Sequence, residues 1–313
     1  MSKIIKSAAR CLLLLVGITF LSFLLMYISP GDPAEIILSK SNMIVSDEAL
    51  EAKREELGLN EPFLVRYKNW LTDILHGDMG VSYKTGRPVF EQFKTALPNT
   101  LAVTAAAMLI STLISVPSGM LCACKKDGFF DRSVRVITYL FASLPSFFLA
   151  LILMYLFCIK LRILPVVSSS GVEGAVLPCL VLALPLSAWC IRQSRSIFLK
   201  ELEKDYVTGL RFRGISERRI MLSHVLKNSA APLITMGGMS FGTMLGGSAI
   251  AESIFSYNGI GKLAVDAISY RDYPVIQAFV LWMAVVFLAV NFLVDILCRA
   301  ADPRIRMGEK TNA

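Results

Sequence analysis

The sequence predicts an all-α membrane protein with six transmembrane helices, a small extracytoplasmic segment after the first helix and a cytoplasmic loop between the fourth and fifth. Of its 313 residues, 55% are hydrophobic, and charge is missing from several long windows. An α-helix rises about 1.5 Å per residue, so roughly 20 apolar residues cross a hydrocarbon core of about 30 Å. Six windows meet or approach this length: Cys11–Ser29, Asn99–Cys124, Val136–Ile159, Gly174–Ile191, Asn228–Ala251 and Tyr273–Val294.

The first window also has features of a secretory signal peptide, because Lys3, Lys6 and Arg10 precede its apolar run. That run is longer than the 7–15 residues usual for a signal peptide, and Ile28-Ser29-Pro30 does not resemble an A-x-A cleavage site. We therefore interpret the window as an uncleaved first span.

Charge asymmetry orients the six spans. Both termini, with the loops at 125–135 and 192–227, lie on one side and carry 20 Lys and Arg against 8 Asp and Glu. The other side (30–98, 160–173 and 252–272) carries 12 against 15. Cytoplasmic loops are enriched in Lys and Arg, so both termini are predicted to be cytoplasmic. The net charge of +8 reflects this asymmetry and gives no reason to invoke nucleic acid.

The sequence lacks the motifs of several other classes. Its seven cysteines form no C-x-x-C pair, and the two histidines are predicted on opposite sides of the membrane, so no metal site or cofactor is expected. There is no H-E-x-x-H and no G-x-x-x-x-G-K-[ST], which argues against a membrane protease and against ATP binding by this chain. An ion-coupled secondary transporter or another polytopic membrane protein is the alternative, although internal repeats and buried carboxylates are not evident.

The extracytoplasmic segment, residues 30–98, is predicted to contain two helices. Ser46 is placed to cap the first and Gly58 to end it, and Pro62 suits the start of the second. About 69 residues with few apolar side chains are too small a core for an enzyme, so we expect the segment to pack on the outer ends of the spans.

The cytoplasmic loop between the fourth and fifth spans reads as helix, tight turn, helix. The first helix is predicted over 200–212, Gly214 supplies the left-handed turn, and Ser216 with Glu217 begins the second helix. A loop that only anchors the spans needs a few basic residues near its ends. Since this one builds a two-helix element with exposed apolar side chains, we favour docking into a groove of another protein.

The fifth span is rich in small residues. Gly238, Gly242 and Gly246 recur at four-residue spacing along one helix face, which permits close approach of another helix. Spacing alone does not separate helix packing from a subunit interface or a translocation path.

Several segments together resemble the permease subunits of bacterial dipeptide, oligopeptide and nickel ABC importers. The loop "DYVTGLRFRG" followed by "HVLKNSAAP" is similar to the loop that carries the coupling helix in that family. The resemblance continues, in the same order along the chain, with the strings "SPGDPAE", "LGLNEPFLVRY", "HGDMGVS", "ESIFSYNGIGKLAVDAISYRDYPVIQ" and "DPRIR". It therefore covers nearly the whole chain.

The resemblance implies a multi-pass subunit of the bacterial inner membrane that works with a second homologous permease, two ATP-binding subunits and an extracellular or periplasmic solute-binding protein. ATP hydrolysis is expected in the partner subunits. The implied segments are 1–29 (N-terminus and first span), 30–98 (extracytoplasmic), 99–298 (permease core) and 299–313 (cytoplasmic tail). The ATPase-coupling loop, 195–227, has as its expected docking residues Leu210, Arg211, Phe212, Arg213, Gly214, Ile215, Glu217 and Arg218.

The chain departs from the family at two positions of the loop. The family commonly has Ala two and four residues before the turn glycine, whereas this chain has Phe212 and Leu210 at those positions. The fine contact geometry with the ATPase is therefore expected to differ. For the substrate, the short loop between the third and fourth spans resembles the nickel branch, and di- or oligopeptides are the alternative. Specificity is expected to rest mainly with the solute-binding protein.

Overall fold

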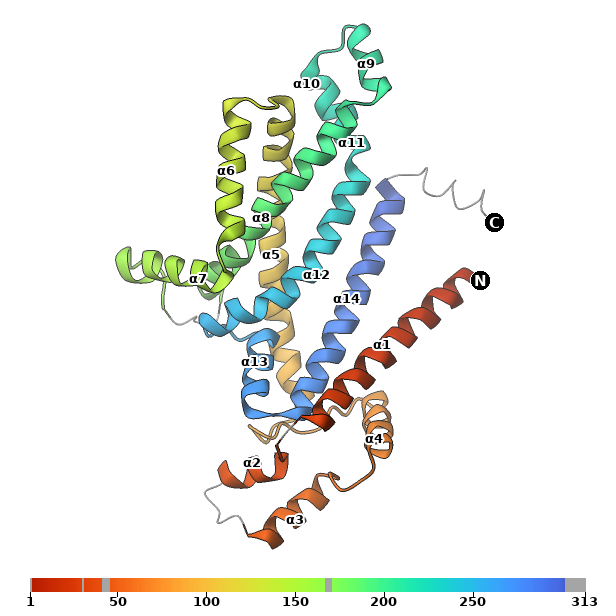
Figure 1. The fold of residues 1–313 in the computed structure, drawn as a ribbon, viewed down its shortest axis with the longest axis vertical. Helices are drawn as coiled ribbons and strands as arrows, with labels where there is room; N and C mark the ends of the chain where they lie inside the picture. The colour runs from red at the N-terminus through yellow and green to blue at the C-terminus, as the bar shows by residue number, and fades with distance from the viewer. Residues whose placement is uncertain (1, 30, 41–45, 167–170, 302–313) are drawn as a thin grey trace. The chain divides into compact units, whose positions relative to one another are not determined.

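The computed structural model describes every residue except 1, 30, 41–45, 167–170 and 302–313 (Figure 1). The described residues are mainly helical, and their only β-type pairing is an isolated antiparallel bridge between Val81 and Pro88. From residue 302 onward the predicted cytoplasmic tail, with its "DPRIR" string, lies outside the described residues. The prediction of an all-α protein is confirmed for the described part of the chain.

The membrane-crossing helices match the predicted windows closely. Five helices are long and apolar enough to cross a membrane: α1 (Ser2–Ile28), α5 (Val89–Cys124), α8 (Val172–Leu202), α12 (Ala230–Ile254) and α14 (Tyr273–Ala301). A sixth crossing would be the bent pair formed by α6 (Phe129–Ser143) and α7 (Ser146–Met154) with the π-helix η1 (Tyr155–Lys160).

The third predicted span, Val136–Ile159, is therefore not one straight helix. The chain bends by 100° between α6 and α7. Leu144 is extended there (φ −79°, ψ 125°), and Pro145 forms the N-cap of α7. A residue before proline is pushed out of the α region by the proline ring. The sequence showed a proline in this window but not the size of the bend.

The chain divides into two compact units. The first comprises residues 1–100 and 258–288, and the second comprises 101–257 and 289–313, so that α5 and α14 contribute to both. The predicted extracytoplasmic segment thus shares a unit with α1, with α13 (Ile260–Tyr270) and with the first part of α14. We call the first the outer unit and the second the core unit.

The outer unit contains three short helices, α2 (Pro33–Lys40), α3 (Asp47–Glu56) and α4 (Phe63–Leu75). Ser46 caps α3 by accepting a hydrogen bond from the Ala49 N–H at 3.2 Å, as predicted. Gly58 follows the end of α3 with φ +62°, and Pro62 is the N-cap of α4. The local signals in the sequence therefore placed both helices correctly.

Helix α4 packs on α1 through a cluster of aromatic rings. Phe20, Phe23 and Tyr27 of α1 meet Phe63, Tyr67 and Trp70 of α4, mostly edge to face, at centroid distances of 5.2 to 6.0 Å. Buried Tyr67 also exchanges a hydrogen bond with the Thr19 hydroxyl at 3.0 Å. Each aromatic pair contributes about 0.5–1.5 kcal/mol beyond area burial, so the cluster fixes α4 against the first span.

A second anchor of the outer unit is the buried carboxylate of Asp272, in the turn between α13 and α14. It accepts hydrogen bonds from the Ser82 hydroxyl (2.5 Å) and from the backbone N–H groups of Tyr83 (3.0 Å) and Lys84 (3.1 Å). Ser82 ends the string "HGDMGVS", Tyr83 and Lys84 follow it, and Asp272 lies in the string after the fifth span, about 190 residues later in the chain. One side chain therefore ties the loop at 82–84 to the start of α14.

Helix α8 forms the centre of the core unit, where α6, α7 and α12 pack against it (Figure 1). Leu177, Val181 and Ala183 of α8 lie in a buried apolar cluster with Leu149 of α7 and Met244 of α12. Helix α5 approaches α8 closely at Gly119, where an added Cβ would lie 2.6 Å from the Cβ of Ser194 and 2.9 Å from the backbone N of Arg195. A side chain larger than hydrogen at this position would separate the two helices.

A buried ion pair connects α6 with α8. The fully buried Asp131 receives two hydrogen bonds from the Arg195 guanidinium, at 2.7 and 2.8 Å, and one from the backbone N–H of Asp127 at 3.0 Å. Arg135 lies 3.6 Å away and pairs with exposed Asp127 as well. A bidentate arginine contact is a strong and directional one, so it sets the relation between the two helices.

We predict that Asp272→Ala loosens the loop at 82–84. The substitution leaves the N–H groups of Tyr83 and Lys84 without their acceptor, and an unsatisfied buried donor costs about 1–3 kcal/mol. Limited trypsin digestion of the purified protein should therefore cut faster after Lys84. Asp266→Ala, which removes only a partly exposed pair to Lys84 at 3.5 Å, is the matched control. Equal cutting rates in the two variants would contradict the anchoring role.

Candidate functional site

The predicted coupling loop forms a small helical projection at one end of the core unit (Figure 1). After α8 come α9 (Asp205–Phe212), α10 (Glu217–Arg219), the π-helix η2 (Ile220–Val225) and α11 (Leu226–Asn228), which leads into α12. The first helix differs from the prediction of 200–212, because α8 runs to Leu202 and the chain breaks at Glu203 and Lys204 before α9 begins.

The turn at Gly214 has the geometry that the sequence predicted. Its φ is +75°, and its N–H donates to the Arg211 carbonyl at 2.9 Å, while the Ile215 N–H donates to the Leu210 carbonyl at 3.2 Å. This pair of bonds is the Schellman motif, in which a left-handed residue after the helix satisfies its last carbonyl groups. Leu210 and Ile215 both pack against one apolar cluster, as the motif requires.

That cluster fastens the loop to the ends of α5 and α8. Its buried members are Ala123, Phe198, Val207, Ile220, Met221 and Val225. The backbone of η2 makes an i→i+5 bond from the Leu226 N–H to the Met221 carbonyl, so residues five apart lie nearly above one another. Ile220 and Val225 therefore both face the cluster. The sequence predicted a continuing helix here but not the π-turn.

The outer surface of the loop is mainly charged. Arg211, Arg213, Glu217 and Arg218 are exposed, and Phe212 has 88% of its surface exposed. Of the predicted apolar docking residues, Phe212 is thus exposed, whereas Leu210 and Ile215 pack against the cluster. Ser216 is the N-cap of α10 but makes no side-chain cap bond. Phe212 and the four charged side chains remain the predicted docking set.

Arg211 and Glu217 hold the two sides of the turn together through hydrogen bonds of 2.7 and 3.2 Å. The Arg211 guanidinium lowers the pKa of Glu217 below its ordinary value. A lowered pKa means that the pair's contribution is present at neutral pH and is lost as the pH falls through the folded pKa. Since both side chains are exposed, the pair contributes at most about 1 kcal/mol.

The predicted glycine face of the fifth span divides between two environments. A Cβ at Gly238 would lie 2.3 Å from Val294 of α14, so this glycine permits a close helix contact within the core unit. Gly246 is exposed, with nothing within 4 Å of an added Cβ, and Gly242 is half-buried. Gly238 is therefore placed for helix packing, and a translocation path at Gly246 stays a prediction.

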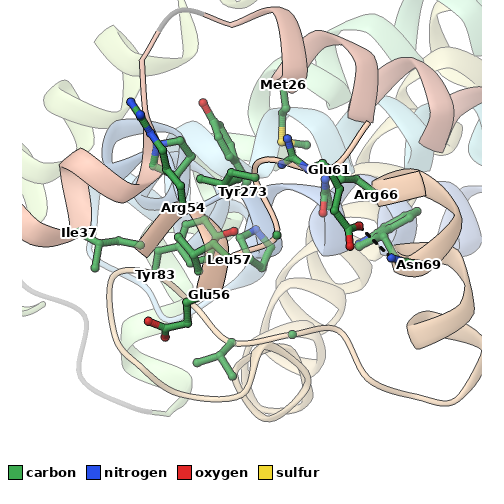
Figure 2. A pocket seen from close by; sticks show the side chains of 18 of the residues that line it. Met26, Ile37, Arg54, Glu56, Leu57, Glu61, Arg66, Asn69, Tyr83 and Tyr273 are labelled. Atoms are coloured by element: carbon green, nitrogen blue, oxygen red, sulfur yellow. Dashed lines mark hydrogen bonds between the residues drawn. The ribbon is translucent and has the colours of Figure 1, made fainter. Parts of the chain in front are cut away.

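Sequence reasoning missed a cavity of about 920 Å³ in the outer unit, formed between the end of α1, α3, α4, the loop at 78–86 and the start of α14 (Figure 2). Figure 2 shows that side chains from widely separated segments line it, among them Arg54, Arg66, Tyr83 and Tyr273. Burial raises the pKa of Tyr83 to about 12. The pocket depends on three-dimensional convergence, which no local motif of the sequence reveals.

A second missed feature is the Asp131–Arg195 pair. Both residues were counted as ordinary charges of cytoplasmic loops. The sequence could have indicated that Arg195 lies on the helix that continues the fourth span. Its partner Asp131 lies 64 residues earlier in the chain, however, and no local pattern connects the two residues. The described residues contain no group of three or more His, Cys, Asp or Glu side chains that could hold a metal ion.

The fold is thus that of a multi-span helical membrane protein with a structured loop between two of its spans. Residues 115–307 match the family model of the binding-protein-dependent transport system inner membrane component, and residues 1–104 match the model of its N-terminal part. The chain belongs to this family and is a permease subunit of an ABC importer.

Relatives and solved structures agree with this assignment. The chain is 35% identical to the metal-staphylopine import system permease protein CntB of Staphylococcus aureus (strain NCTC 8325), over 98% of this chain and 99% of that protein. It is 36% identical to the probable peptide ABC transporter permease protein y4tP of Sinorhizobium fredii, over 91% and 92%. A chain of the inward-facing MetNI methionine ABC transporter shares the fold, with TM-score 0.58 and 17% identity, over 67% and 96%.

Proposed function

We propose that this permease transmits ATP-driven motion through the loop centred on Gly214 and imports nickel, as the ion or a chelate, or di- and oligopeptides. The observation that carries the proposal is the rigid turn itself, which holds an exposed Phe212 and four charged side chains on a base fixed by buried apolar contacts. A stiff projection transmits displacement, whereas a flexible loop would absorb it. Two ATP-binding subunits would dock here and carry out the hydrolysis.

The remaining partners and the orientation follow from the same proposal. A second homologous permease would complete the translocation path, and a solute-binding protein would deliver substrate at the extracytoplasmic side. The charge asymmetry of the loops supports cytoplasmic termini and a cytoplasmic position for the Gly214 loop. ATP binding would shift the pair of permeases between inward-facing and outward-facing states, because the ATPases bind the two states differently.

The substrate proposal draws on two relatives named for metal-staphylopine and for peptide transport. The direct test is uptake by cells lacking this chain, with radioactive nickel compared against a labelled dipeptide at submicromolar concentration. Loss of either uptake, restored by the gene, supports import of that substrate. Loss of neither, when other importers for both substrates have also been deleted, would contradict the substrate proposal.

We predict that Gly214→Pro abolishes uptake while the protein still inserts into the membrane. Proline cannot adopt φ +75°, and it lacks the N–H that bonds to the Arg211 carbonyl. Uptake by complemented cells and the amount of protein in the membrane fraction are the two measurements. Gly17→Ala, a change in α1 outside the coupling loop with nothing within 4 Å of the added Cβ, should leave uptake unchanged. Normal uptake by Gly214→Pro would remove the coupling role.

We also predict that Glu217→Lys weakens co-purification of the ATPase subunits. The change reverses a charge on the exposed surface and also breaks the internal pair with Arg211. The swapped variant Arg211→Glu/Glu217→Lys separates the two effects, because it can restore the internal pair. If docking uses these charges, the swap stays weak in co-purification. Full recovery in the swap would show that only the turn's integrity matters.

A further inference from the structure

The cavity of the outer unit has one wall made by a single stripe of α4. Arg66, Asn69, Trp70 and Asp73 all line it, at the i, i+3, i+4, i+7 spacing of one helix face. The volume of about 920 Å³ is within the range of small-molecule sites. The stripe carries a positive charge at one end and a negative charge at the other.

Arg66 is held for binding an anion. Its guanidinium lies 5.9 Å from the ring centroids of Phe23 and of Tyr27, so aromatic faces support it. Within the described residues no carboxylate lies within ion-pair distance of it, whereas Lys53 and Arg54, the other cations of the lining, are paired with Glu56 and Asp32. Arg66 therefore offers an uncompensated fork of donors, which suits a carboxylate.

Asp73 provides the complementary charge. It lies two helical turns after Arg66, which is roughly 10 Å along the helix axis. Its carboxylate has no ion-pair partner in the described part of the chain and is exposed. Trp70 and Tyr273 also line the cavity, while the Trp70 Nε1 and Tyr273 hydroxyl atoms themselves are buried from solvent.

The spacing of the two residues on α4 indicates a ligand length. The axial rise between them is roughly 10 Å, which about three residues of an extended chain would cover at 3.3–3.6 Å per residue. We infer that the outer cavity binds a short peptide of about three residues in extended form, with its carboxylate at Arg66 and its ammonium group at Asp73. The inference rests on the proposed function, since it makes this unit a receiving site for imported peptide.

The test uses the purified importer complex in nanodiscs, without its solute-binding protein. Equilibrium binding is measured for tritiated trialanine, for its C-terminal amide and for its N-acetyl form. The intact complex should prefer trialanine over each blocked form by about tenfold, since a charge-assisted hydrogen bond contributes about 1.5–3 kcal/mol. A tetra- and a dialanine should bind more weakly than the tripeptide.

Two variants locate the two ends of the ligand. Arg66→Gln should lose the preference for the free carboxylate and keep that for the free ammonium group, and Asp73→Asn should do the reverse. Because Asp73 is exposed, its variant decides the matter if Arg66→Gln fails to assemble. Arg87→Gln, an exposed arginine outside the lining, is the control and should keep both preferences.

Three results would overturn the inference. The first is no trialanine binding at millimolar concentration, and the second is equal binding of the free and blocked peptides. The third is evidence that the cavity has another ligand. Such evidence would be binding of a nickel–histidine complex alone, or loss of solute-binding-protein capture in Arg66→Gln when no peptide binds. The proposed function fails separately, through normal uptake by Gly214→Pro.

Discussion

The structure depends on one constraint, which is that a chain within the bilayer must satisfy its backbone hydrogen bonds internally. Long helices α5, α8, α12 and α14 meet this requirement by themselves. At the bend between α6 and α7, Pro145 has no N–H that could be left unbonded. In the loop predicted to lie outside the membrane, Asp272 accepts hydrogen bonds from the N–H groups of Tyr83 and Lys84.

Charge is used sparingly and at junctions. Asp131 and Arg195 connect α6 with α8, and Asp272 connects the loop at 82–84 with the start of α14. Burying a carboxylate costs desolvation free energy, which its several hydrogen-bond donors offset while they also fix its geometry. Asp131 lies in the first turn of α6 and Asp272 lies just before α14. These carboxylates therefore fix helix ends, while apolar side chains pack the central parts of the helices.

The two regions for which roles are proposed are built in different ways. At the Gly214 loop, a Schellman turn, a salt bridge and a buried apolar cluster all fix the same short segment. The cavity of the outer unit is formed between α1, α3, α4 and the loop at 78–86, with aromatic packing against Arg66. The proposed role of the first region is coupling to ATP hydrolysis, and that of the second is recognition of a ligand.

The sequence by itself determined the features that depend on local pattern and composition. Long uncharged windows gave the spans, and Ser46, Gly58 and Gly214 placed caps and turns, because helix ends are governed by the few residues beside them. Only the structure showed the size of the 100° bend at Pro145, the π-turn, the packing of half-buried Ile215, the partner of Asp131 and the cavity around Arg66. The Asp131–Arg195 pair and the cavity depend on contacts between residues far apart in the chain, and no short window of sequence encodes such contacts.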